Sequence, residues 1–164
     1  MNLFWLDASA LAKRYLPEKG TALMNHLFKQ TPSEEMICLL QGVGEAISIF
    51  LRRRNEGKIT DAVYRQILLE LRSEISDQSQ VEKIHPTESQ VTDSWDLMET
   101  HSINSTDAII LKCALDKVVD LRNDSDDLVL VSSDARLVRA AKAEGLLTFN
   151  PETDDQKTLD SLIN

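Results

Sequence analysis

The sequence is poor in the residues that define several protein classes. Two cysteines in 164 residues are too few for a disulfide-stabilised scaffold, and Cys38 and Cys113 lack the neighbouring histidines and cysteines of a zinc site. The five glycines form no glycine-rich phosphate loop, which excludes the common nucleotide-binding loop motifs. Apolar runs are only a few residues long, so we expect no membrane span and no membrane partner.

The sequence also lacks the features of an exported chain. The N-terminal residues run directly into a strand-like apolar segment with no basic region before it, so we expect no signal peptide. Two isolated thiols within apolar segments are typical of buried small residues in a reducing compartment. We therefore expect a cytoplasmic protein.

Basic residues are outnumbered by acidic ones. The chain has 18 Lys and Arg residues against 27 Asp and Glu residues, with a formal net charge of −9 at pH 7. Proteins that bind nucleic acid through a broad electrostatic surface usually carry a basic patch, so this balance argues against such a surface. It leaves metal-dependent chemistry open, because metal-binding carboxylates contribute to an acidic excess and a bound ion reverses the local field.

Short apolar runs alternate with longer segments of helical periodicity. Strands are expected near residues 3–7, 35–40, 81–84, 128–132 and 146–149. Helices are expected near residues 9–16, 20–30, 42–54, 59–77, 86–101, 105–118 and 135–144. This alternation predicts an α/β fold with a five-stranded, mostly parallel sheet flanked by helices. We expect one domain over residues 1–151 and a C-terminal tail, 152–164, with helical periodicity.

Four acidic residues lie where strands are predicted to end or where helices are predicted to begin. They are Asp7, Glu45, Asp107 and Asp134. Asp7 and Asp134 follow apolar strands, and the carboxyl ends of parallel strands border the ligand crevice of such sheets. Carboxylates flanked by core residues are unfavourable unless they are paired or bind a cation. If the four converge, they form an oxygen-rich pocket suited to Mg²⁺ or Mn²⁺.

Each of these acids also has a purely structural interpretation. Asp7, Asp107 and Asp134 could cap the helices that begin beside them, and Glu45 could pair with an arginine on its own helix. Capping and metal binding are compatible, because helix N-termini and strand ends border the same crevice. The acidic loop 123–127 precedes its strand and lacks the glycine and distal glutamate of a calcium loop, so we interpret it as a solvated turn.

Four segments of the chain resemble, in the same order, the acidic motifs of PIN-domain proteins. They are residues 6–15, which begin Leu-Asp-Ala-Ser, residues 44–46, residues 105–109 and residues 130–137. The exit from the last predicted strand at residues 150–151 is also similar to that of many members. Each motif is short, but the resemblance extends over nearly the whole chain. The chain resembles in particular the VapC-type toxins of type II toxin–antitoxin systems.

The resemblance implies a PIN-like three-layer fold and a Mg²⁺- or Mn²⁺-dependent endoribonuclease. Such an enzyme hydrolyses phosphodiester bonds of an RNA substrate and leaves a 5′-phosphate. Asp7, Glu45, Asp107 and Asp134 would be its catalytic and metal-binding acids. The resemblance further implies a homodimer and a cognate antitoxin protein as partner.

Other residues follow from the same resemblance. Ser9 and Ser132 match small hydroxyl positions beside the acids. Lys13 and Arg14 are candidates for contacts with the RNA backbone on a different ground, their position directly after the first acid in the sequence. A catalytically idle PIN fold that serves as a binding module is the alternative. A phosphatase with an aspartyl nucleophile is disfavoured, because those enzymes typically open with Asp-x-Asp whereas this chain has Asp-Ala-Ser at residues 7–9.

Overall fold

The structure of the protein is a computed structural model that describes residues 1–77 and 80–163. Its elements, in chain order, are β1 (Asn2–Leu6), α1 (Ala8–Tyr15), α2 (Thr21–Gln30), a 3₁₀ turn (Ser33–Glu35), β2 (Met36–Leu39), α3 (Leu40–Asn55), α4 (Asp61–Leu71), a π-helical turn (Arg72–Ser76), β3 (Glu82–Ile84), α5 (Glu88–His101), α6 (Ser105–Asn123), β4 (Asp127–Val131), α7 (Ala135–Ala143), β5 (Leu147–Phe149) and α8 (Gln156–Ile163).

The five strands form one sheet in the order β3-β2-β1-β4-β5, and all neighbouring strands pair in parallel. The predicted five-stranded α/β fold is therefore confirmed. The central strand β1 has β2 on one side and β4 on the other, so the topological switch point lies between β1 and β4. Leu6 pairs with Val131, which places the carboxyl ends of these two strands side by side. A ligand crevice is expected at this point of a parallel sheet.

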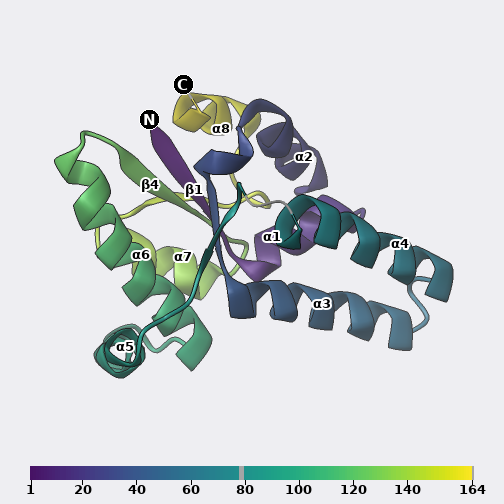
Figure 1. The fold of residues 1–164 in the computed structure, drawn as a ribbon, viewed down its shortest axis with the longest axis horizontal. Helices are drawn as coiled ribbons and strands as arrows, with labels where there is room; N and C mark the ends of the chain where they lie inside the picture. Colours follow the sequence, from purple (N-terminus) through teal and green to yellow (C-terminus); the bar gives the residue numbers. More distant parts are fainter. Residues whose placement is uncertain (78–79, 164) are drawn as a thin grey trace.

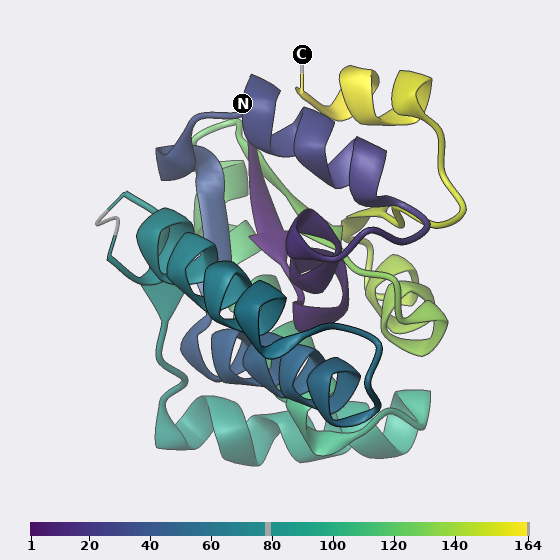
Figure 2. The same cartoon turned by 90° about the vertical axis from the view of Figure 1, so that its right-hand side faces the viewer.

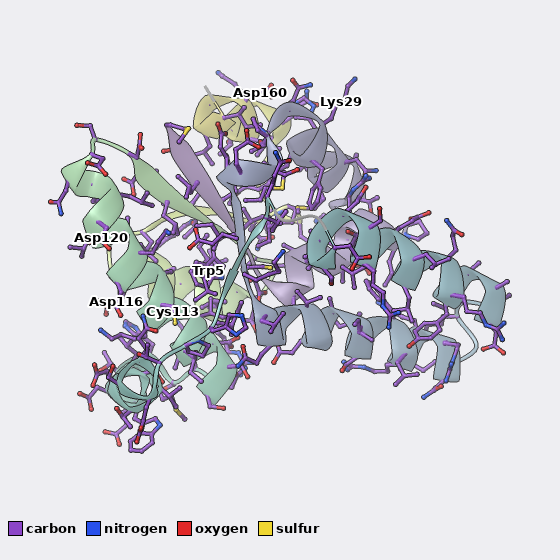
Figure 3. All side chains as sticks on the ribbon, viewed as in Figure 1. Trp5, Lys29, Cys113, Asp116, Asp120 and Asp160 are labelled. Carbon is purple, nitrogen blue, oxygen red and sulfur yellow. The ribbon has the colours of Figure 1, made fainter. Side chains whose placement is uncertain are left out.

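The sheet separates two hydrophobic cores. Successive side chains of a strand point to opposite faces, so Phe4 and Leu6 enter one core and Leu3 and Trp5 enter the other. Helices α1, α2, α3, α4 and α8 cover the first face, whereas α5, α6 and α7 cover the second (Figures 1 and 2). Trp5 is completely buried (Figure 3). Each fully buried aliphatic or aromatic side chain contributes about 1.5–3 kcal/mol, so the two cores hold the three layers together.

Most of the helices have a polar side chain as their N-cap. The capping side chains, each accepting a hydrogen bond from a backbone N–H of the first turn, belong to Asp7, Thr60, Thr87, Asn104 and Asp134. Helix α3 differs, because it follows β2 directly with Leu39 as its N-cap and no side-chain cap. Apolar packing of its inner face, which buries Val43, Ala46 and Phe50, replaces the missing cap.

The turn between α1 and α2 packs against the exit of β5. Gly20 adopts a φ of 94°, and a Cβ at this position would lie 2.8 Å from the carbonyl oxygen of Pro151, so only glycine fits. The tail then returns as α8, whose Leu159 is buried in the first core. Asn2 donates a hydrogen bond from Nδ2 to the carbonyl oxygen of Leu162 at 2.7 Å, and the two chain ends lie close together (Figure 1).

Three predicted element boundaries were wrong. The helix expected at 105–118 continues to Asn123, because Val118 is buried and Leu121 packs against the second core. The helix expected at 59–77 is α4 followed by a π-helical turn. The helix expected at 42–54 begins two residues earlier, at Leu40, although it contains Gly42 and Gly44. No helix in the described ranges is long and apolar enough to cross a membrane.

Candidate active site

Asp7 lies where β1 ends and α1 begins. Its backbone N–H donates to the carbonyl oxygen of Val131 at 3.0 Å, which extends the pairing of β1 with β4 by one residue. Its side chain is 5% exposed. Asp7 Oδ2 accepts hydrogen bonds from the Ser9 N–H at 3.2 Å, from Ser9 Oγ at 2.5 Å and from Ser132 Oγ at 2.9 Å. One carboxylate oxygen is thus held firmly by three donors, and Oδ1 accepts no hydrogen bond from the described residues.

Ser9 and Ser132 connect the ends of β1 and β4. The Ser133 N–H donates to Ser9 Oγ at 2.9 Å, and the Asp134 N–H donates to Ser132 Oγ at 3.0 Å. The two hydroxyl oxygens are 3.3 Å apart. The loop after β4 is therefore tied to the carboxylate of Asp7. This network explains how two residues separated by 127 positions, Asp7 and Asp134, take up defined places beside each other.

Asp134 caps α7 with one oxygen. Its Oδ1 accepts from the backbone N–H groups of Arg136 at 2.7 Å and Leu137 at 3.3 Å. Its Oδ2 lies 3.6 Å from a guanidinium nitrogen of Arg136, whose side chain is largely exposed. The structural interpretation of Asp134 as an N-cap is therefore confirmed, and the second oxygen remains available at the cavity.

Asp107 lies in the first turn of α6 and is 7% exposed. Its backbone N–H donates to Asn104 Oδ1 at 2.9 Å, while Asn104 Nδ2 donates to Asp107 Oδ2 at 2.7 Å. Asn104 therefore caps the helix and orients the carboxylate with the same side chain. Asp107 Oδ1 accepts no hydrogen bond from the described residues.

Glu45 lies in the second turn of α3. Its carboxylate forms no hydrogen bond or ion pair with any residue in the ranges 1–77 and 80–163. The interpretation of Glu45 as the partner of an arginine on its own helix was therefore wrong for the described residues. The side chain is half-buried and free to turn toward the other acids.

One cavity collects the four predicted acids. Asp7, Glu45, Asp107 and Asp134 all line a cavity of about 340 Å³ at the carboxyl ends of β1 and β4. Its other lining residues are Ala8, Ser9, Ser48, Ile49, Arg52 and Asn104. Four separate segments of the chain thus bring carboxylates to one concave surface, which we call the acidic cavity.

The clustering of these carboxylates contributes to a raised pKa of Asp107. Its pKa is raised to about 7, first by burial and then by the negative charges of Asp7 and Asp134; Arg136 lowers it and Glu45 raises it by smaller amounts. Like charges in a poorly solvated site favour the protonated form. Without a cation, the cavity therefore holds part of a proton near neutral pH.

The chain was then compared with known proteins. A family model described as PIN domain matches residues 21–152, which is most of the chain. The chain belongs to the PIN domain family. This PIN domain has Glu45, Asp107 and Asp134 inside the matched range, whereas Asp7 and Ser9 precede it.

Two solved structures are similar to this PIN domain in fold. PAE2754 from Pyrobaculum aerophilum has a TM-score of 0.63 at 18% identity, over 99% of this chain and 98% of that one. FitAcB from Neisseria gonorrhoeae has a TM-score of 0.53 at 15% identity, over 93% of this chain and 100% of that one. At these identities the similarity concerns the fold. No curated protein matches the sequence.

The donor chemistry of the acidic cavity fits a hard divalent cation, although the side chains do not enclose one as they stand. Within the described ranges, no three Asp, Glu, His or Cys side chains are grouped closely enough to hold a metal ion. Mg²⁺ usually keeps several waters and takes one or two carboxylates directly. The free oxygens of Asp7 and Asp107 and the unpaired Glu45 meet that requirement without a contracted cluster.

The two predicted RNA-backbone residues have other contacts. Lys13 is 4% exposed and pairs with Glu18 at 3.0 Å and with Glu152 at 2.5 Å. Arg14 pairs with Glu74 at 2.7 Å and lines a different cavity, together with Phe28. The structure therefore does not bring either side chain to the acidic cavity.

Two lining residues of the PIN domain were absent from the predicted site. Asn104 is typical of a helix cap in the sequence, and its contact with the Asp107 carboxylate depends on the orientation of that side chain. Arg52 was one of three consecutive arginines, and nothing in that run distinguishes it from its neighbours. Both lie in the acidic cavity in the structure.

Proposed function

We propose that this PIN domain is a metal-dependent endoribonuclease. The observation that supports the proposal is the acidic cavity, where Asp7, Glu45, Asp107 and Asp134 from four distant segments line one surface at the switch point of the sheet. An all-oxygen donor set suits Mg²⁺ or Mn²⁺. The pKa of Asp107, raised first by burial and then by the charges of Asp7 and Asp134, supports it as well, because a bound cation would favour the ionised carboxylate.

Each site residue has a defined task in this proposal. Asp7, with Asp134 or Asp107, would bind the ion directly, and Glu45 would contact it through water or orient the attacking water. Ser9 and Ser132 donate hydrogen bonds to Asp7 Oδ2 and would leave Oδ1 available to bind a cation. When bound, the ion supplies a Lewis acid for the phosphoryl oxygen and lowers the pKa of water near it.

Cleavage of a labelled single-stranded RNA by the purified protein tests this function. We expect cutting with Mn²⁺ or Mg²⁺, none with excess chelator, and products with a 5′-phosphate. Asp7→Asn should lower the rate at least about 100-fold, because the metal contributes several kcal/mol of transition-state stabilisation. Asp96→Asn is the matched control, since Asp96 is exposed on α5 and has no partner among the described residues. Equal rates for the two variants would contradict the assignment.

We further propose that the enzyme is the toxin of a type II toxin–antitoxin system, acting in the cytoplasm as a homodimer. A basic side chain of a helical antitoxin would find complementary charge in the acidic cavity. The free, buried Cys38 and Cys113 suit a reducing compartment. Expression of the wild-type chain should arrest growth while Asp7→Asn does not, and the product of an adjacent gene should restore growth and co-purify. Normal growth on wild-type expression would contradict the toxin role.

A further inference from the structure

The three consecutive arginines near the end of α3 have three different environments. Successive helical residues are rotated by about 100°, so their side chains leave the helix in different directions. Arg53 pairs with Glu18 at 3.3 Å. Arg54 lies 3.7 Å from Asp61 and 4.7 Å from the centre of the Tyr64 ring, which connects α3 with α4. The Arg52 guanidinium has no hydrogen bond or ion pair with any residue in the described ranges.

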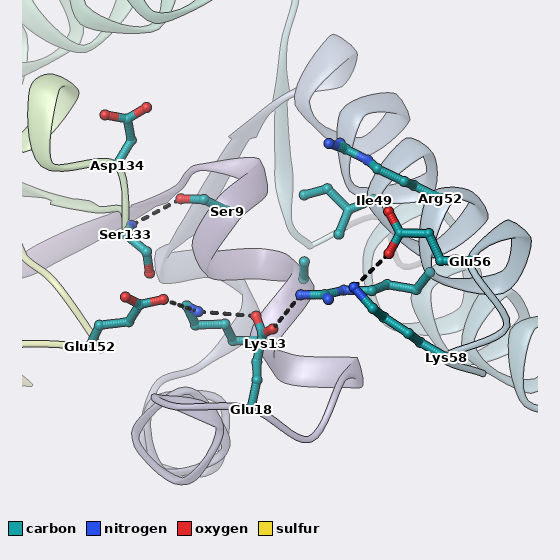
Figure 4. Close-up of a pocket in the computed structure, with 12 residues that line it drawn as sticks. Ser9, Lys13, Glu18, Ile49, Arg52, Glu56, Lys58, Ser133, Asp134 and Glu152 are labelled. Atoms are coloured by element: carbon teal, nitrogen blue, oxygen red, sulfur yellow. Dashed lines mark hydrogen bonds and ion pairs between the residues drawn. The ribbon is translucent and has the colours of Figure 1, made fainter.

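Arg52 lies between two cavities. It lines the acidic cavity and also a larger cavity of about 510 Å³, which we call the adjoining cavity. Ser9, Ile49 and Asp134 also line both, so the two cavities are neighbours on the surface. In Figure 4 the guanidinium of Arg52 extends from α3 toward the side on which Ser9 and Asp134 lie.

The other cations of the adjoining cavity are already neutralised. Lys13 is held by two glutamates, Arg53 by Glu18 and Lys58 by Glu56 at 2.7 Å (Figure 4). Within the described ranges, Arg52 is the cation of this cavity that forms no hydrogen bond or ion pair. The pKa of Glu56 is lowered, first by its hydrogen bond with Lys58 and only to a smaller extent by the charges of Lys58, Arg53 and Arg52. An exposed guanidinium offers five donors in a fixed fork that matches two phosphate oxygens, and binding it breaks no existing ion pair.

We propose that Arg52 binds the backbone phosphate next to the scissile one, with the RNA strand running from the acidic cavity into the adjoining cavity. The inference rests on the ribonuclease function proposed above. The scissile phosphate has its charge compensated at the metal site, whereas the neighbouring phosphate would face Asp134 and the glutamates of the adjoining cavity without compensation. The free guanidinium of Arg52 supplies the missing positive charge.

Steady-state cleavage of single-stranded RNA with Mn²⁺ at several salt concentrations tests the role of Arg52. For Arg52→Gln we expect a loss in kcat/KM of about 10-fold, mainly through a higher KM, because one charged hydrogen-bonding group is removed. The slope of log(kcat/KM) against log[salt] should flatten by about 0.7, the value for one phosphate contact to a single strand. Arg52→Lys should keep the slope and recover part of the loss, because it keeps the charge without the fork.

Arg65→Gln is the matched control, because Arg65 is exposed on α4, has no described partner and lines neither cavity. Its kinetics should stay within about two-fold of the wild type, and both variants should unfold at the wild-type urea concentration, since neither loses an intramolecular contact. If the wild type cuts RNA and Arg52→Gln has the KM and salt slope of Arg65→Gln, the phosphate site is refuted while the nuclease function stands. If the wild type does not cut RNA, the proposed function itself fails.

Discussion

Replacement of Asp107 by asparagine tests whether the four carboxylates act on one another. Burial, and then the charges of Asp7 and Asp134, raise the pKa of Asp107 to about 7. The folded protein therefore keeps a proton at pH values where the unfolded chain has lost it. This contribution to stability is fully present below the ordinary Asp pKa of about 4 and is lost as the pH rises to about 7. Asparagine at position 107 does not titrate, so the free energy of unfolding of Asp107→Asn should lack this dependence on pH.

The size of the effect follows from linkage. Release of one proton changes the free energy of unfolding by at most about 1.4 kcal/mol per pH unit. The acidic cavity opens to water, which screens its charges, so we expect a smaller slope than this ceiling. One kcal/mol shifts the Tm of a domain of this size by about 2–4 °C, which sets an upper limit of roughly 3–6 °C per pH unit.

Thermal unfolding in EDTA at pH 5, 6 and 7 measures this slope. The wild type should lose stability relative to Asp107→Asn as the pH rises, whereas the control Asp96→Asn should stay parallel to the wild type. Mg²⁺ at pH 7 should then raise the wild-type Tm more than that of Asp107→Asn, because the ion offsets the repulsion and Asp107 is one of its proposed ligands. Parallel curves for wild type and Asp107→Asn would refute the reasoning.

Three further substitutions test an ion-pair cluster and two glycine positions of the protein. Lys13→Met removes the charge that pairs with Glu18 and Glu152. We expect the free energy of unfolding, measured in urea, to fall by about 2 kcal/mol. A charged hydrogen bond contributes about 1.5–3 kcal/mol, and water partly screens the glutamates. Unchanged stability with a higher KM for RNA would instead favour the backbone contact predicted from the sequence. Gly44→Ala adds a Cβ that meets no atom within 4 Å and should stabilise α3 by about 0.5–1 kcal/mol. Gly57→Ala, where space is equally free but φ is 70°, should destabilise by about 1 kcal/mol, and a gain at Gly57 would contradict the backbone argument.

Much of the architecture could be predicted because it follows from local patterns. β1 and β4 are apolar runs that end at a polar residue, and each strand is followed by a helix, so a parallel sheet with Asp7 and Asp134 at one edge was expected. The end of α6 was predicted five residues too early, at residue 118 instead of Asn123. Leu121 packs against the second core and keeps this segment helical.

The partners of the charged residues could not be predicted in the same way. Lys13 follows the first acid and therefore resembled a substrate contact, but Glu152, which comes from the far end of the chain, neutralises it. Arg52, Arg53 and Arg54 are consecutive, so the sequence alone does not show which of them lacks an ion-pair partner. The freedom of Arg52 depends on where Glu18 and Asp61 lie, and packing between helices decides that.

The sequence by itself determined which residue types this protein offers and where along the chain they fall: four acids at strand ends and helix starts, with period-two and helical apolar patterns between them. These patterns specify which segments form strands and helices and which face of each is buried, because the spacing of apolar residues along the chain decides which face is apolar. Only the tertiary structure decided which side chains meet, because an ion pair or a cavity depends on distances between segments. It joined Asp7 to the loop after β4 through two serines, neutralised Lys13, and left the guanidinium of Arg52 free beside the acids.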